Sequence, residues 1–131
     1  MDISLQDLYS YNMEQARGVA GNNLITVFME TQGLTLQEAA DRCGEMFRSV
    51  IQKFLEYKKE VIARPFSLRG GYNPDVDRKV MIGIESMERM VVGYMGYSFD
   101  SPRYFGNEGK EILKTRLVKL REPMDHLSSI V

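Results

Sequence analysis

Three oxygen-bearing side chains near the start of the sequence share the spacing of one helical face. Gln6, Ser10 and Glu14 are each four positions apart, so on an α-helix successive members differ by about 40° around the axis and lie ~6 Å apart along it. An amide, a hydroxyl and a carboxylate supply the oxygen ligands that a hard divalent cation such as Mg²⁺ accepts. The same spacing also fits a solvated helix face, and Asp7 beside it fits a first-turn acid that interacts with the helix dipole.

A second run of chemical interest contains Arg103 and Tyr104, much further along the chain. A guanidinium presents planar donors that match phosphate oxygens, and a phenol hydroxyl adds another donor. Taken alone, the pair is no functional signal and favours an arginine in a surface loop beside a packed tyrosine.

Composition narrows the class of protein. Lys and Arg number 17 and Asp and Glu number 18, a net charge of −1, which excludes a protein that holds nucleic acid mainly through phosphate contacts. One cysteine, Cys43, and one histidine exclude an internal disulfide framework and the usual zinc site. No apolar run reaches the ~18 residues of a membrane span, and no secretory signal is visible. We therefore expect a soluble cytoplasmic protein without an integral membrane segment.

Helical periodicity runs through almost the whole chain, whereas strand-like alternation is not sustained anywhere. This pattern predicts an all-α fold of about five helices. Asn22 or Asn23 can cap the second helix and Gly33 suits its end, while Thr35 and Glu38 have the spacing of a capping box at the start of the third. The expected helices cover residues 2–16, 23–32, 36–64, 74–94 and 107–121, with loops at 64–74 and 96–106 and a frayed tail beyond Pro123.

The run QDLYSYNME, residues 6–14, resembles the N-D-x-x-S-x-x-x-E motif of class I terpene synthases, particularly the fungal sesquiterpene synthases. In that family the Asn, Ser and Glu hold one of three Mg²⁺ ions that bind the substrate diphosphate. The resemblance therefore implies Ser10 and Glu14 as metal ligands. Gln6 stands where the family has asparagine, and its amide lies one methylene farther out. The stretch over residues 17–23 and the helix after Thr35 are also similar to the family.

The run YSFDSPRYFG, residues 97–106, resembles the family segment W-S-F-x-x-x-R-Y-F-G, with Tyr97 in place of the tryptophan. Its Arg and Tyr hydrogen-bond the diphosphate, which implies that role for Arg103 and Tyr104. The resemblance spans essentially all of residues 1–131 and corresponds to the C-terminal part of a single, incomplete terpene synthase domain. The aspartate-rich D-D-x-x-D/E motif has no counterpart, and Asp75 and Asp77 fit helix capping and dipole roles instead.

The resemblance implies a sesquiterpene synthase-like lyase that ionises farnesyl diphosphate with Mg²⁺, releases diphosphate and cyclises the resulting cation. Because the aspartate-rich motif and the helices that would enclose the prenyl chain have no counterpart, we expect this chain alone to be inactive. We also expect its exposed apolar faces to favour self-association. The alternative is a non-catalytic, degenerate helical domain that acts as a binding or interaction module.

Overall fold

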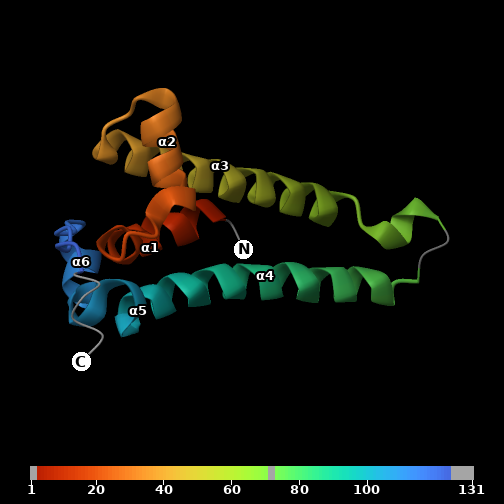
Figure 1. The fold of residues 1–131 in the computed structure, drawn as a ribbon. Coiled ribbons are helices and arrows are strands. Elements are labelled where there is room, and N and C mark those ends of the chain that lie inside the picture. The colour runs from red at the N-terminus through yellow and green to blue at the C-terminus, as the bar shows by residue number, and fades with distance from the viewer. Residues whose placement is uncertain (1–2, 71–72, 125–131) are drawn as a thin grey trace.

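The computed structural model describes residues 3–70 and 73–124, which contain α-helices and short 3-10 helices but no β-strand. The predicted all-α fold is therefore confirmed. Figure 1 shows α1, α2, α5 and α6 gathered at one end, from which the two long helices α3 and α4 extend side by side. In chain order the elements are α1 (Ile3–Ala16), η1 (Ala20–Asn22), α2 (Leu24–Gln32), α3 (Leu36–Ala63), η2 (Phe66–Arg69), α4 (Asp75–Asp100), α5 (Pro102–Phe105), η3 (Gly106–Glu108) and α6 (Gly109–Thr115).

The first three helices begin and end where local signals predict. The Asn23 side chain accepts a hydrogen bond from the Ile25 backbone N–H at 3.0 Å, so Asn23 is the cap of α2. Gly33 ends that helix with a φ of 66°, a left-handed conformation that glycine adopts without strain. The predicted capping box opens α3, because the Thr35 backbone N–H donates to the Glu38 carboxylate at 2.8 Å and Thr35 Oγ1 accepts from the Glu38 N–H at 3.3 Å.

The prediction that the fourth helix ends near Tyr94 and is followed by a loop over 96–106 is wrong. α4 continues to Asp100, and residues 102–105 form the one-turn helix α5. The extra turn of α4 carries Phe99, which packs with the cluster formed by α1, α5 and α6, and this packing outweighs the low helix propensity of Gly96. The Ser101 hydroxyl then caps α5, which begins at Pro102.

The prediction of a last helix over residues 107–121 is also wrong. α6 covers only Gly109–Thr115, because Arg116 adopts a left-handed conformation with a φ of 60°. The chain then runs without helix along α1, where Asn12 Nδ2 donates to the Lys119 carbonyl at 3.0 Å and Asn12 Oδ1 accepts from the Arg121 N–H at 2.8 Å. The expected frayed tail falls mainly on residues 125–131, which lie outside the described part of the chain.

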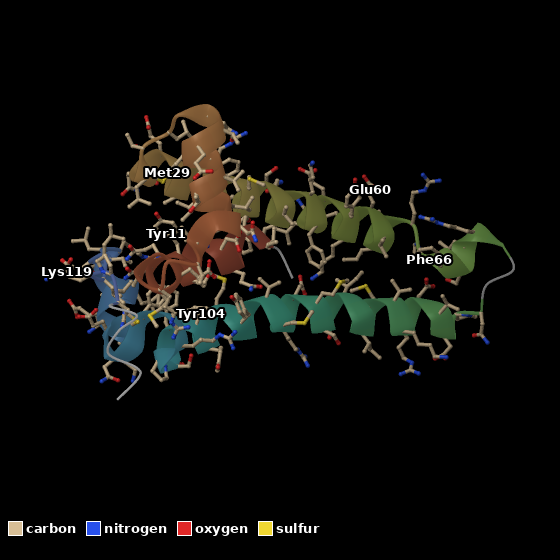
Figure 2. The ribbon with its side chains drawn as sticks, in the orientation of Figure 1. Tyr11, Met29, Glu60, Phe66, Tyr104 and Lys119 are labelled. Carbon is tan, nitrogen blue, oxygen red and sulfur yellow. The ribbon has the colours of Figure 1, made fainter. Side chains whose placement is uncertain are left out.

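The core lies in two clusters at the compact end of the molecule. One joins α1 to α5 and α6 through buried aromatic and aliphatic side chains, and Figure 2 places Tyr104 in this region. Within it, the rings of Phe99 and Phe105 stack with centroids 5.0 Å apart. The other joins α2 to α3 through Ile25, Ala39 and Cys43. Burial of these side chains fixes α1 against its neighbours, and α1 carries the metal-ligand candidates.

The outer parts of α3 and α4 are poorly covered. A Lys58–Glu88 ion pair of 2.7 Å joins the two helices, but such partly exposed pairs contribute only ~0–1 kcal/mol. Large apolar side chains remain exposed along both helices, namely Val50, Leu55, Tyr57, Ile62, Ile82, Met87, Met90, Val92 and Tyr97. Among the described residues, no helix combines the length and apolar character that crossing a membrane requires.

The acidic residues that open α4 hold local structure. Asp75 forms ion pairs with Arg78 and Lys79 at 2.8 and 2.9 Å. Asp77 Oδ1 accepts a hydrogen bond from the Phe66 backbone N–H at 2.6 Å, which fastens η2 to α4. Figure 2 shows Phe66 at the end of the long helices that is remote from α1. Both aspartates lie in the first turn of α4, as the predicted dipole role requires, but the predicted capping role is wrong, because Pro74 stands at the cap position and no side chain caps the helix.

We expect this fastening to weaken in acid. Hydrogen bonds, first from the Ser67 side chain and then from the Ser67 and Phe66 backbone, hold the pKa of Asp77 below its ordinary value of 3.8. They favour the charged form, so their stabilisation is complete above pH 3.8 and is lost as the pH falls through the lowered pKa. NMR shifts of the Phe66 amide should report the release. Asp77→Ala should release η2 already at neutral pH, while Asp77→Asn, which keeps an acceptor but lacks the charge, should weaken the contact at neutral pH about as much as acid does in the wild type. Equal Phe66 amide exchange in wild type and Asp77→Ala would contradict this.

Candidate functional site

The two runs singled out in the sequence line one cavity of about 590 Å³. α1 contributes Gln6, Ser10 and Glu14 from one face, as their spacing predicts, and α5 contributes Arg103 and Tyr104. Besides these five residues, the lining contains Met13, Arg17, Tyr97, Ser101 and Pro102. The fold thus brings oxygen ligands and a cation to a common space.

Asn23, at the start of α2, forms hydrogen bonds with the α1 side chains that line the cavity. Its amide Nδ2 donates to Glu14 Oε2 at 3.1 Å, lies 3.5 Å from Ser10 Oγ, and donates to the Asp7 backbone carbonyl at 2.9 Å. Asn23 is 2% exposed and Ser10 is 6% exposed. Because the same side chain caps α2 through Oδ1, it connects the start of α2 directly to the cavity-lining residues of α1.

Asp7 also connects α1 to the start of α2. Its Oδ2 accepts a hydrogen bond from the Leu24 backbone N–H at 2.8 Å, so it interacts with the first residue of α2 rather than with the dipole of its own helix. The expectation of a first-turn acid in α1 is therefore wrong. Burial raises the pKa of Asp7, the bond from Leu24 opposes that rise, and the charge of Glu14 adds to it. Asp7 thereby helps to fix the angle between α1 and α2.

The opposite wall of the cavity depends on the turn between α4 and α5. Tyr104 is buried in the aromatic cluster, and its hydroxyl lies 3.1 Å from that of Tyr94 on α4. Burial first, and then this hydrogen bond, raise the pKa of Tyr94, so the Tyr94 phenol remains protonated at neutral pH. The Arg103 guanidinium lies over the Tyr104 ring at 5.4 Å from its centroid, while the residue itself remains exposed. An exposed cation thus lies beside a buried phenol.

Similarity to known proteins shows which family this chain belongs to. Residues 3–53 match the family model described as terpene synthase family 2, C-terminal metal binding. An alpha-muurolene synthase of Coprinopsis cinerea is 38% identical over 114 residues, which cover 87% of this chain and 25% of that protein. This chain belongs to the terpene synthase family. Sesquiterpene synthase Agr3 of Cyclocybe aegerita is 37% identical over 87% of the chain and 29% of the relative.

The terpene synthase chain spans only part of these relatives. A further C. cinerea protein, named linoleate 10R-lipoxygenase COP4, is 36% identical over 88% of the chain and 31% of its own length. The chain therefore covers between 25% and 31% of the three relatives. Because the matched residues 3–53 include Gln6, Ser10 and Glu14, the metal-ligand candidates lie within the region that the family model describes as metal binding.

The donor set in this terpene synthase chain fits a hard divalent cation. Gln6, Ser10 and Glu14 offer amide, hydroxyl and carboxylate oxygens to one cavity, and oxygen ligands are what Mg²⁺ prefers. In residues 3–70 and 73–124, no three His, Cys, Asp or Glu side chains gather as a metal site. A set built from mixed oxygen donors, with Glu14 as its single carboxylate, is therefore the arrangement that these residues provide.

Two residues of the site were not singled out from the sequence for these roles. Arg17 adds a second cation to the cavity lining, and Asn23, which contacts the lining residue Glu14 without lining the cavity, was identified only as a cap candidate. A signal existed for Arg17, since it follows Glu14 by three positions and residues three apart share a helix face. No short-range signal pointed to the second role of Asn23, because its contacts with Asp7 and Glu14 cross from one helix to another.

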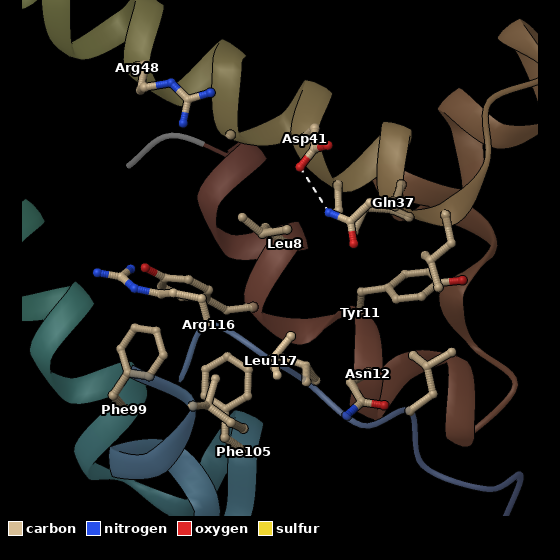
Figure 3. Close-up of a pocket in the computed structure, with 18 residues that line it drawn as sticks. Leu8, Tyr11, Asn12, Gln37, Asp41, Arg48, Phe99, Phe105, Arg116 and Leu117 are labelled. Carbon is tan, nitrogen blue, oxygen red and sulfur yellow. Dashed lines mark hydrogen bonds between the residues drawn. The ribbon is translucent and has the colours of Figure 1, made fainter. Parts of the chain in front are cut away.

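A second cavity of about 440 Å³ lies on the other side of α1, between α3 and the segment after α6 (Figure 3). Leu8, Tyr11 and Phe105 give it an apolar lining, and Gln37 donates to Asp41 at 3.0 Å at its edge. None of the five predicted site residues lines it. The sequence-predicted chemistry is therefore confined to the first cavity.

Proposed function

We propose that this chain forms the part of a sesquiterpene synthase active site that binds Mg²⁺ and the diphosphate of farnesyl diphosphate. The observation that carries the proposal is that Glu14 and Arg103, from two runs far apart in the sequence, line one cavity. A metal ligand and a phosphate-binding cation must lie at one site if they are to act on the same diphosphate. Membership of the terpene synthase family supports the reaction class.

Each residue has a defined task in this proposal. Ser10 and Glu14 hold one Mg²⁺, and Gln6 supplies a third oxygen. The Arg103 guanidinium binds diphosphate oxygens through its planar fork. The Tyr104 hydroxyl donates a hydrogen bond to the same group, and accepts one from the Tyr94 hydroxyl, which keeps it in place.

The proposed reaction begins when the bond between the allylic carbon and the diphosphate oxygen breaks. The electron pair leaves with the diphosphate, which Arg103 and Tyr104 bind, and the prenyl chain becomes an allylic cation that cyclises. Mg²⁺, when bound, supplies Lewis-acid stabilisation of the leaving group. The chain contributes the diphosphate end of this site, and a water-excluding pocket for the prenyl chain is needed to protect the cation.

Calorimetric titration of the chain with inorganic pyrophosphate tests the proposal. We expect binding in the presence of Mg²⁺ and its loss when the metal is removed with a chelator. Incubation with farnesyl diphosphate and Mg²⁺, followed by gas chromatography, should give no cyclic product from this chain alone. Pyrophosphate binding that does not depend on Mg²⁺, or no binding at all, would contradict the metal site. Binding without turnover is also the behaviour of the alternative, a non-catalytic binding module.

We also propose that the exposed faces of α3 and α4 make the isolated chain self-associate. Val92 on α4 is 70% exposed, and burying such a side chain is worth ~1.5 kcal/mol, or about tenfold in affinity. Val92→Glu should therefore weaken association about tenfold in sedimentation velocity. Ser86→Glu, the same charge change at an exposed polar position of α4, is the control. A chain that stays monomeric at all concentrations, or equal effects of both variants, would contradict self-association.

A further inference from the structure

We infer that Asn23 is a positioning residue that orients the Glu14 carboxylate and the Ser10 hydroxyl for the metal. This inference rests on the proposed function, since it concerns how the proposed ligands are held. Asn23 lies at the start of α2 and does not itself line the cavity. It acts through the two α1 side chains that do.

The hydrogen bonds of Asn23 divide between two helices. Oδ1 accepts from the Ile25 N–H at 3.0 Å, which fixes the side chain to the first turn of α2. Nδ2 faces α1, where it donates to Glu14 Oε2 at 3.1 Å and to the Asp7 carbonyl at 2.9 Å. A planar amide has an acceptor on one side and two donors on the other, so one residue satisfies both helices.

Burial makes this geometry rigid. Asn23 is 2% exposed, and Ser10, whose Oγ lies 3.5 Å from Nδ2, is 6% exposed. A hydrogen bond from a buried donor to an ionised carboxylate is stronger than a hydrogen bond between two neutral groups. One oxygen of Glu14 is thereby held, and this limits the positions that the carboxylate can take at the cavity wall. Groups that orient a metal ligand in this way commonly change metal affinity 10–100-fold when removed.

Asparagine is the residue type that this position requires. Serine can cap α2 nearly as well, but its side chain is too short to reach Glu14 from the start of the next helix. Aspartate also caps but has no proton to donate when ionised. Asn23→Ser therefore separates the two tasks, because it keeps a cap and removes the donor that faces α1.

The test compares Asn23→Ser with Asn22→Ser, a change of the same type at the exposed neighbouring residue. Binding of Mn²⁺ alone is followed by electron paramagnetic resonance, and binding of pyrophosphate with Mg²⁺ by calorimetry. We expect Asn23→Ser to lose roughly tenfold or more in Mn²⁺ affinity and to keep the helical circular dichroism signal of Asn22→Ser, with a lower melting temperature because the buried Asp7 carbonyl loses its donor. Asn22→Ser should bind like the wild type.

Each outcome decides the inference. Wild-type affinity in Asn23→Ser would overturn it while leaving the metal site intact. No Mn²⁺ binding by the wild type would overturn the proposed function and the inference with it. Asn23→Thr, which also keeps a cap, is the second variant. Loss of helical signal in both variants would overturn the positioning role, because Asn23 would then be a determinant of the fold.

Discussion

Replacing Glu14 by glutamine is expected to abolish Mg²⁺-dependent pyrophosphate binding while leaving the fold intact. Glutamine has nearly the same shape and keeps an acceptor for Asn23 Nδ2, which lies 3.1 Å from Glu14 Oε2. It removes the single carboxylate among the described residues that line the cavity. The affinity for pyrophosphate should fall roughly 100-fold or more. Removing a group that merely orients a metal ligand already lowers metal affinity by up to about 100-fold. Calorimetry with Mg²⁺ and pyrophosphate measures it.

Two measurements control for this change. Glu30→Gln, on the exposed surface of α2, removes the same charge and should bind pyrophosphate like the wild type. Because the charge of Glu14 contributes to the raised pKa of Asp7, Glu14→Gln should lower that pKa, and the Leu24 amide shift can follow its titration. Unchanged Mg²⁺-dependent binding in Glu14→Gln would remove Glu14 from the metal site.

Adding one methyl group at Gly109 is expected to destabilise the chain strongly. A Cβ at this position would overlap the Phe99 carbonyl oxygen and lie 2.9 Å from the Phe99 carbonyl carbon and 3.1 Å from its Cα. These are backbone atoms of α4, so no side-chain rotation relieves the clash. Gly109→Ala must therefore move α6 away from α4, at a cost of roughly 3 kcal/mol. Thermal unfolding measures this loss.

A matched glycine separates the clash from the general effect of the substitution. Gly93, within α4, has nothing within 4 Å of an added Cβ. Gly93→Ala should stabilise the chain by about 0.5–1 kcal/mol, because glycine is costly in a helix interior. In Gly109→Ala, amide exchange should also speed up at Arg121, whose N–H donates to Asn12. Similar melting temperatures for the two variants would show that α6 does not depend on this close approach.

The sequence alone predicted the features that depend on neighbouring residues. The capping box at Thr35, the cap at Asn23 and the left-handed end at Gly33 are all confirmed, because each depends on hydrogen bonds within a few positions of the chain. The spacing of Gln6, Ser10 and Glu14 placed them on one face for the same reason, since a helix repeats every 3.6 residues. Their metal-binding role came from the family resemblance and stays a prediction.

Only the tertiary structure decided which elements meet. The extension of α4 to Asp100 depends on aromatic packing against α1 and α5, which outweighs the local preference of Gly96. The segment after Arg116 leaves the helical conformation and bonds to Asn12 across 107 positions of sequence. The second role of Asn23 has the same origin. The family resemblance predicted that Glu14 and Arg103 would lie at one site, and the packing of α1 against α5 brings them to one cavity. Helical periodicity and capping act over one or two turns, whereas the site is completed by contacts that exist only once α1 is buried between its neighbours.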